Sequence, residues 1–170
     1  MILITDRLIL KKLTNKDFGP LCKILQNPDV MYAYEHAFSD AEVKDWLDKQ
    51  IKRYKDDGFG MWAVFLKETN ELIGQCGLTM QEFNQNQVLE VGYLFQQDFW
   101  HMGYATEAAI ACKEYAFEKL AANEVYSIIR DNNIPSQNVA LRNGMTIVDE
   151  FTKHYYGMDM LHYVYRSVKG

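Results

Sequence analysis

The stretch Phe99–Leu120, FWHMGYATEAAIACKEYAFEKL, joins a glycine-bearing loop to an amphipathic helix, and the rest of the chain can be placed around it. The first N–H groups of a helix lack intrahelical partners and lie at the positive end of the helix dipole, so they attract phosphate oxygens. Gly103 and Ala105 keep bulky side chains away, and Thr106 adds a hydroxyl. The pattern predicts an anion site, although a plain amphipathic helix after a punctuating glycine would look the same.

The expected helix has two faces. Its packing face is small and apolar, with Ala108, Cys112, Ala116 and Leu120, which predicts close packing on a sheet. Its water-facing stripe carries Glu107, Glu114 and Glu118.

The segment WHMGYATEA resembles the pyrophosphate loop of the Gcn5-related N-acetyltransferases (GNAT), whose pattern is Gln or Arg, two residues, Gly, one residue, then Gly or Ala. Gly103 and Ala105 match this pattern, whereas Trp100 stands where Gln or Arg is usual. That Trp before GYATEA, and TDRLILKKLTNKDF at residues 5–18, resemble the RimJ/RimL-like branch of ribosomal-protein N-terminal acetyltransferases.

Composition limits the class of protein. A chain of 170 residues that is 48% hydrophobic can bury the core of one domain, which we place at residues 1–170. The net charge of −5 and the absence of a basic block argue against nucleic-acid binding. Three cysteines without a CxxC pair indicate reduced thiols and predict no metal site. Asp6 and Arg7 interrupt the apolar N-terminal run, so we expect no signal peptide, no membrane contact and a cytoplasmic protein.

The order of expected elements indicates an α+β fold with a mixed sheet. Helix starts are expected at 14–17, 39–40, near Gly103 and at 131–136, with Pro28 ending the first helix. The resemblance implies the GNAT acyl-CoA N-acyltransferase fold, whose mixed, mostly antiparallel sheet has six to seven strands and is flanked by four helices. Strands are expected at 8–12, 61–66, 72–80, 88–95, 124–130, 146–155 and 160–168.

The segment Val30–Phe38 is aromatic and lacks clean periodicity. Two interpretations stay open for it. Either the segment determines acceptor specificity, or Tyr32, Tyr34 and Phe38 simply pack between two helices.

The resemblance implies acetyl-CoA as co-substrate. We expect backbone N–H groups of the Gly103 loop to surround its pyrophosphate, and main-chain groups at the end of the 88–95 strand to pair with its pantetheine amides. Asn133 and Asn138, in NNIPSQNVALRNGM, are expected to contact it with their amides; a turn residue and a surface helix residue are the alternatives. The cofactor-binding residues expected are Leu94, Phe95, Gln96, His101, Met102, Gly103, Tyr104, Ala105, Thr106, Asn133 and Asn138.

Two residues are candidates for proton transfer. Glu90 is the expected base, because an acid among apolar strand residues has its pKa raised by desolvation; by strand alternation it could equally face solvent. Many family members protonate the leaving thiolate with a Tyr at the position of Ala140, so Ser136 is the expected substitute.

The function expected is transfer of an acetyl group from acetyl-CoA to a primary amine, with a protein or peptide N-terminus as one acceptor. Amino acids, polyamines and antibiotics are alternative acceptors, because one fold serves many substrates. A non-catalytic acyl-CoA-binding module is the third hypothesis. The protein is expected to be a monomer or a homodimer.

Overall fold

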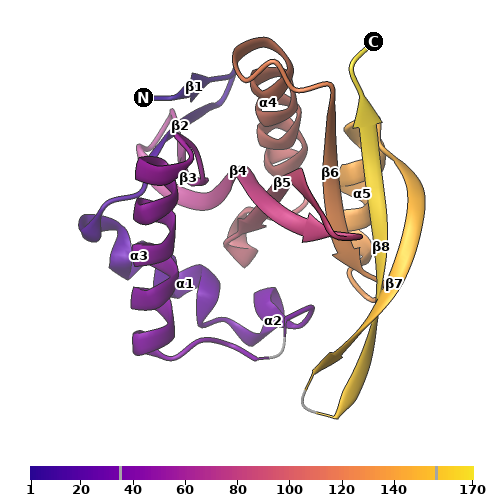
Figure 1. Cartoon of the computed structure of the whole chain (residues 1–170). Coiled ribbons are helices and arrows are strands. Elements are labelled where there is room, and N and C mark those ends of the chain that lie inside the picture. Colours follow the sequence, from indigo (N-terminus) through magenta and orange to yellow (C-terminus); the bar gives the residue numbers. More distant parts are fainter. Residues whose placement is uncertain (35, 156) are drawn as a thin grey trace.

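The computed structural model describes residues 1–34, 36–155 and 157–170. Its strands form an eight-stranded sheet in the order β1-β2-β3-β4-β5-β6-β8-β7, in which β5 and β6 are parallel and all other neighbours are antiparallel (Figure 1). The strands are β1 (Leu3–Ile4), β2 (Leu8–Lys12), β3 (Met61–Leu66), β4 (Glu71–Phe83), β5 (Asn86–Phe95), β6 (Glu124–Arg130), β7 (Thr146–Tyr155) and β8 (Met158–Val168). The α+β class with a mixed, mostly antiparallel sheet is confirmed.

In the described part of the chain, five α-helices accompany the sheet: α1 (Phe18–Leu25), α2 (Pro28–Met31), α3 (Asp40–Asp56), α4 (Tyr104–Lys119) and α5 (Ile134–Arg142). Single 3-10 turns lie at Asn15–Asp17 and Gln97–Phe99. The sequence-based prediction missed β1 and α2, which have two and four residues and are too short to show a period. The first helix ends before Pro28, as expected, since α1 stops at Leu25. Pro28 itself occupies the first turn of α2, where its missing N–H costs nothing.

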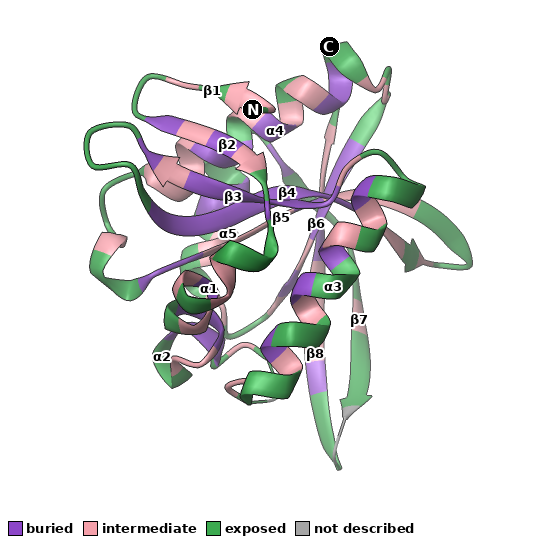
Figure 2. Ribbon diagram, turned by 90° about the vertical axis from the view of Figure 1, so that its left-hand side faces the viewer, coloured by how far each residue is buried: buried purple, intermediate pink, exposed green. Residues whose placement is uncertain are grey.

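Helices cover both faces of the centre of the sheet. Residues 72–79 of β4 are all buried, and neighbouring residues on a strand point to opposite faces. On one face Cys76 Sγ lies 3.6 Å from Cys112 Sγ of α4; on the other, the Trp46 indole of α3 donates to Gln75 Oε1 at 2.9 Å. The buried strands of Figure 2 therefore run between α4 and α3.

The small residues of α4 permit this close packing. Ala108, Cys112 and Ala116 are fully buried, as the packing face predicted, whereas Leu120 is only partly buried. The described residues contain no helix with the length and apolar character needed to cross a membrane.

Candidate active site

Helix α4 begins without a side-chain cap. Gly103 is its N-cap residue in the left-handed conformation, with φ of +79°, and no side chain bonds the first turn. By contrast, Ser39 and Asn133 accept hydrogen bonds at the starts of α3 and α5. Since Glu107 N–H is the first to bond within the helix, donating to Gly103 O at 3.0 Å, the preceding N–H groups remain available to an anion.

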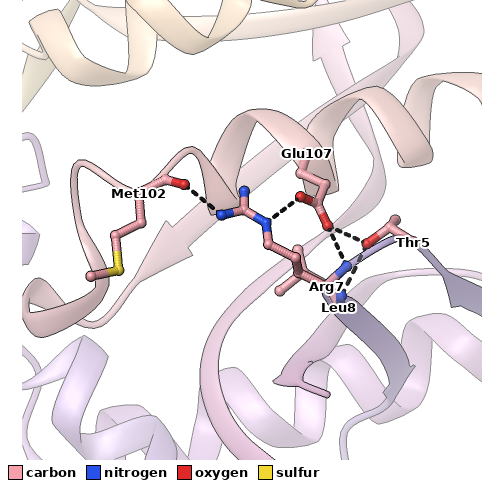
Figure 3. A network of polar contacts seen from close by, with 5 residues as sticks. All are labelled: Thr5, Arg7, Leu8, Met102 and Glu107. Atoms are coloured by element: carbon pink, nitrogen blue, oxygen red, sulfur yellow. Dashed lines mark hydrogen bonds and ion pairs between the residues drawn. The ribbon is translucent and has the colours of Figure 1, made fainter. Parts of the chain in front are cut away.

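Arg7, from the step between β1 and β2, holds this loop in place (Figure 3). Its Nη1 donates to Met102 O at 2.9 Å, its Nε donates to Glu107 Oε1 at 2.8 Å, and its guanidinium lies 4.4 Å from the centre of the Tyr104 ring. A Cβ on Gly103 would lie 3.4 Å from Arg7 Nη2, so the glycine lets a cation approach the helix start closely.

Glu107 is the hub of the same network, which corrects the prediction that it lies on a water-facing stripe. Its carboxylate accepts hydrogen bonds from Thr5 Oγ1 at 2.5 Å and Arg7 N–H at 3.0 Å as well as the guanidinium, and its side chain is 20% exposed. Burial raises the pKa of Glu107, but the bonds from Thr5 and Arg7 outweigh it and leave the pKa lowered. Glu107 therefore ties the start of α4 to the N-terminal strands.

Strands β5 and β6 separate immediately after one parallel register pair, Glu90 with Tyr126. Continuing the ladder would join Ile128 N–H to Val91 O. Instead, Glu90 Oε2 accepts from Ile128 N–H at 2.7 Å, and Ser127 Oγ donates to Val91 O at 2.7 Å. The side chains of Glu90 and Ser127 thus replace the main-chain bond between Ile128 N–H and Val91 O. Both main-chain groups therefore stay hydrogen-bonded where the strands separate.

The split directs alternate main-chain groups of β5 toward β6. Gln96 N–H donates to Ile73 O at 2.9 Å, so by ladder alternation the main chain of Leu94 faces β4, and that of Tyr93 and Phe95 faces the split. Gln96 O accepts from Phe99 N–H at 3.0 Å. This corrects the expectation for Leu94 and Gln96, whose main-chain N–H groups are not offered to a ligand.

Phe95 is the third residue, with Leu94 and Gln96, whose main chain was expected to pair with the pantetheine amides. Its carbonyl accepts from Trp100 Nε1 at 3.0 Å, which leaves its N–H on the side of the split. Trp100 therefore fixes the end of β5, which gives a structural reason for a Trp at this point of the loop.

Desolvation is the main influence on the pKa of Glu90. Burial raises its pKa from an ordinary value of 4.5 to about 7, against the opposing effects of the Ile128 N–H bond and the charges of Lys153 and Arg53. Of the two alternatives, the structure therefore shows the side chain in the split rather than free in solvent. A carboxyl group with a pKa near neutrality suits proton abstraction.

A cavity of about 780 Å³ opens beside the split and is lined by Glu90, Leu94, Asn133 and Ser136, among others. It brings together these four predicted site residues but does not include the loop 101–106, which lies outside its lining. The two ends of segment 30–38 lie in different surroundings. Val30 and Met31 are buried in the core, whereas Tyr34, His36 and Phe38 line the cavity. Glu35 lies outside the described residues.

The α5 region shows which predicted amides are already engaged. Asn133 caps α5, with Oδ1 accepting from Ser136 N–H at 3.3 Å and from Tyr32 Oη at 3.1 Å. Asn138 lies on the exposed face of α5. Ala140 is buried, so the helix packs tightly where relatives of the resembled family carry Tyr.

Sequence reasoning missed Tyr93 at the cavity, whereas Tyr34 belongs to the 30–38 segment that it had singled out. Tyr93 Oη donates to Ser136 O at 2.6 Å, and burial raises its pKa well above the ordinary value. Desolvation of the hydroxyl at the cavity, followed by the charge of Glu90, raises the pKa of Tyr34 to about 12, although 40% of the residue's surface is exposed. Both hydroxyls therefore keep their protons at neutral pH. Tyr93 lies on β5, and a Tyr on a strand gives no signal of this in the sequence.

An acetyltransferase (GNAT) domain model matches residues 7–146. The chain belongs to the GNAT acetyltransferase family. GNAT enzymes use acetyl-CoA.

Individual relatives agree with the assignment. The uncharacterized protein YkkB of Bacillus subtilis (strain 168) is 34% identical over 144 residues, covering 84% of each chain. An acetyltransferase structure from Agrobacterium tumefaciens str. C58 has a TM-score of 0.82 and 28% identity, covering 98% of this chain and 94% of that one. RimL, a ribosomal L7/L12 alpha-N-protein acetyltransferase in complex with coenzyme A, shares the fold, with a TM-score of 0.79, 18% identity and coverage of 98% and 97%.

Proposed function

We propose that this GNAT enzyme transfers the acetyl group of acetyl-CoA to a primary amine, with Glu90 as the base. The observation that carries the proposal is the carboxyl group at the β5–β6 split, whose pKa burial raises to about 7 beside a cavity large enough for a small acceptor. N–H groups at the start of α4 would hold the pyrophosphate, and Phe95 N–H faces the split where the pantetheine arm would lie.

Acetyl-CoA, when bound, supplies a thioester carbonyl. The amine nitrogen forms the new C–N bond, its proton passes to Glu90, and the C–S electron pair leaves with sulfur as the coenzyme A thiolate. Ser136 lines the cavity and is our proposed proton donor to that thiolate. Because alkyl thiols have a pKa of about 8.5, the thiolate leaves without full protonation, and the donor matters less than the base.

Thiol release measured with a panel of peptides, amino acids, polyamines and aminoglycosides tests the proposal. We expect at least one amine to release coenzyme A faster than the amine-free reaction. Glu90→Gln should reduce that rate, whereas Glu114→Gln, on the exposed face of α4, should preserve it. Tight coenzyme A binding with no thiol release for any amine would instead favour the non-catalytic module.

A further inference from the structure

Three cations line the cavity without a salt bridge to any residue in the described part of the chain: Lys49 and Arg53 on α3, and Arg130 on β6. Arg53 has a weak bond from Nη1 to Gln50 Oε1 at 3.3 Å. Arg130 Nη1 donates to Tyr32 O at 3.4 Å, and its buried Nε has no hydrogen-bond partner among the described atoms. This side of the cavity therefore presents positive charge without a matched counter-charge.

Lys49 and Arg53 also disfavour each other. They stand four residues apart on α3, the spacing at which like charges repel. Burial, followed by the charge of Arg53, lowers the pKa of Lys49, and burial lowers that of Arg53 despite the fields of Asp57 and Glu90. Removing cations from water is costly unless a counter-charge compensates, so a bound anionic group would relieve this cost.

The negative groups of the cavity are arranged differently. Glu82 comes from β4, and Asp149 and Glu150 come from β7, the strand that pairs with β8 at the far edge of the sheet (Figure 1). Lys153 of β7 lines the cavity as well. Glu90 and Arg53 line the same cavity, and the charge of each shifts the pKa of the other, so Glu90 lies near the cationic side. A small molecule can therefore place an amine at Glu90 and an anionic group at Arg53.

We propose that the acceptor is a primary amine that also carries a carboxylate, which Arg53 binds with Lys49 and Arg130 beside it while the amine faces Glu90. Arg53 is assigned the main contact because its planar guanidinium can bind a carboxylate through two parallel hydrogen bonds. A free amino acid and a peptide with an acidic residue beside its N-terminus share this chemistry. The proposal rests on the proposed function, since it names the acceptor of the same site.

Matched acceptors test the proposal through thiol release with saturating acetyl-CoA. One pair is phenylalanine and phenylalaninamide; the other is Ala-Asp and Ala-Asn, both with amidated C-termini. We expect kcat/KM for the carboxylate member of at least one pair to be about tenfold or more above its neutral partner. The pair that shows the preference separates an amino acid from a peptide acceptor.

Variants then locate the carboxylate contact. Arg53→Gln should abolish the preference by raising the KM of the carboxylate member, with the KM for acetyl-CoA unchanged. Because the charge of Arg53 also lowers the pKa of Glu90, the preference is compared as the ratio of the two members within each protein. Arg53→Lys should restore part of it. Lys52→Gln is the matched control, because Lys52 is exposed, bonds Asp56 and does not line the cavity. Melting temperatures compare the folding of all variants.

The possible failures are distinguishable. Equal kcat/KM within both pairs, with thiol released, would overturn the carboxylate acceptor and leave the acetyltransferase proposal standing. A preference that survives in a folded Arg53→Gln protein would overturn the role of Arg53. No thiol release with any amine would remove the proposed function, and this inference with it.

Discussion

Replacing Glu90 with Gln separates two effects of this acid, the loss of folding stability caused by its desolvation and its contribution to kcat/KM. The pKa of Glu90 rises from 4.5 to about 7, which corresponds to about 3 kcal/mol between the two protonation states. Below pH 4.5 the carboxyl is protonated in both the folded and unfolded protein, so it imposes no penalty. Between pH 4.5 and about 7 the unfolded chain loses this proton while the folded protein keeps it, so stability falls across that range and levels off once the folded protein ionises too. The neutral amide of the Glu90→Gln variant avoids this loss.

Urea unfolding of both proteins at about pH 5 and about pH 8.5 measures the effect. We expect the Glu90→Gln variant to gain stability relative to wild type between these two pH values, by up to about 3 kcal/mol. Its kcat/KM should nevertheless fall by about 100-fold or more at the higher pH, since the base is lost. Wild-type kcat/KM should rise with pH through about 7.

Glu114→Gln, on the exposed face of α4, is the control that should change neither quantity. A stability difference between wild type and Glu90→Gln that is the same at both pH values would show that Glu90 is not desolvated. Our reasoning about the base would then be refuted.

Three further substitutions test other parts of the structure. Gly103→Glu should abolish coenzyme A binding in calorimetry with the melting temperature within a few degrees of wild type, because it adds bulk and negative charge at the start of α4; unchanged affinity would contradict the loop assignment. Glu107→Ala should cost about 2 kcal/mol in urea unfolding at pH 7 and raise the KM for acetyl-CoA, since it removes three hydrogen bonds. Because the pKa of Glu107 is lowered, the cost should shrink as pH falls through that pKa. Arg7→Ala should cost less in the Glu107→Ala protein than in wild type, since only its contacts with Met102 and Tyr104 remain to be lost. Gly77→Ala should lower stability by about 2 kcal/mol or more, because its Cβ would lie 2.0 Å from Gly60 O; a protein as stable as wild type would show that the β3–β4 contact can yield.

Local signals predicted most of the framework. The polar turn at 67–71 separates two apolar runs, and β3 and β4 follow on either side of it. The small packing face of α4 correctly indicated a close contact with the sheet, because Ala108, Cys112 and Ala116 recur at helical spacing. Elements shorter than one period, such as β1 and α2, gave no such signal.

The site depended on contacts that local patterns cannot encode. Arg7 and Glu107 are 100 residues apart in sequence, so the residues near Glu107 gave no sign that it bonds Arg7 rather than facing solvent. Likewise, the period of a strand tells which side chains share a face, but not which main-chain groups face β4 and which face the split. That is why Leu94 and Gln96 were assigned to the pantetheine arm, although Tyr93 and Phe95 hold the outward-facing positions.

Amide chemical shifts recorded by NMR during a titration with coenzyme A test most directly whether the pyrophosphate lies at the start of α4 and the arm along β5. We predict saturable shifts of the N–H groups of Ala105 and Thr106 together with that of Phe95. Binding with shifts confined to β7 and β8, and none in the loop or at the end of β5, would contradict the account.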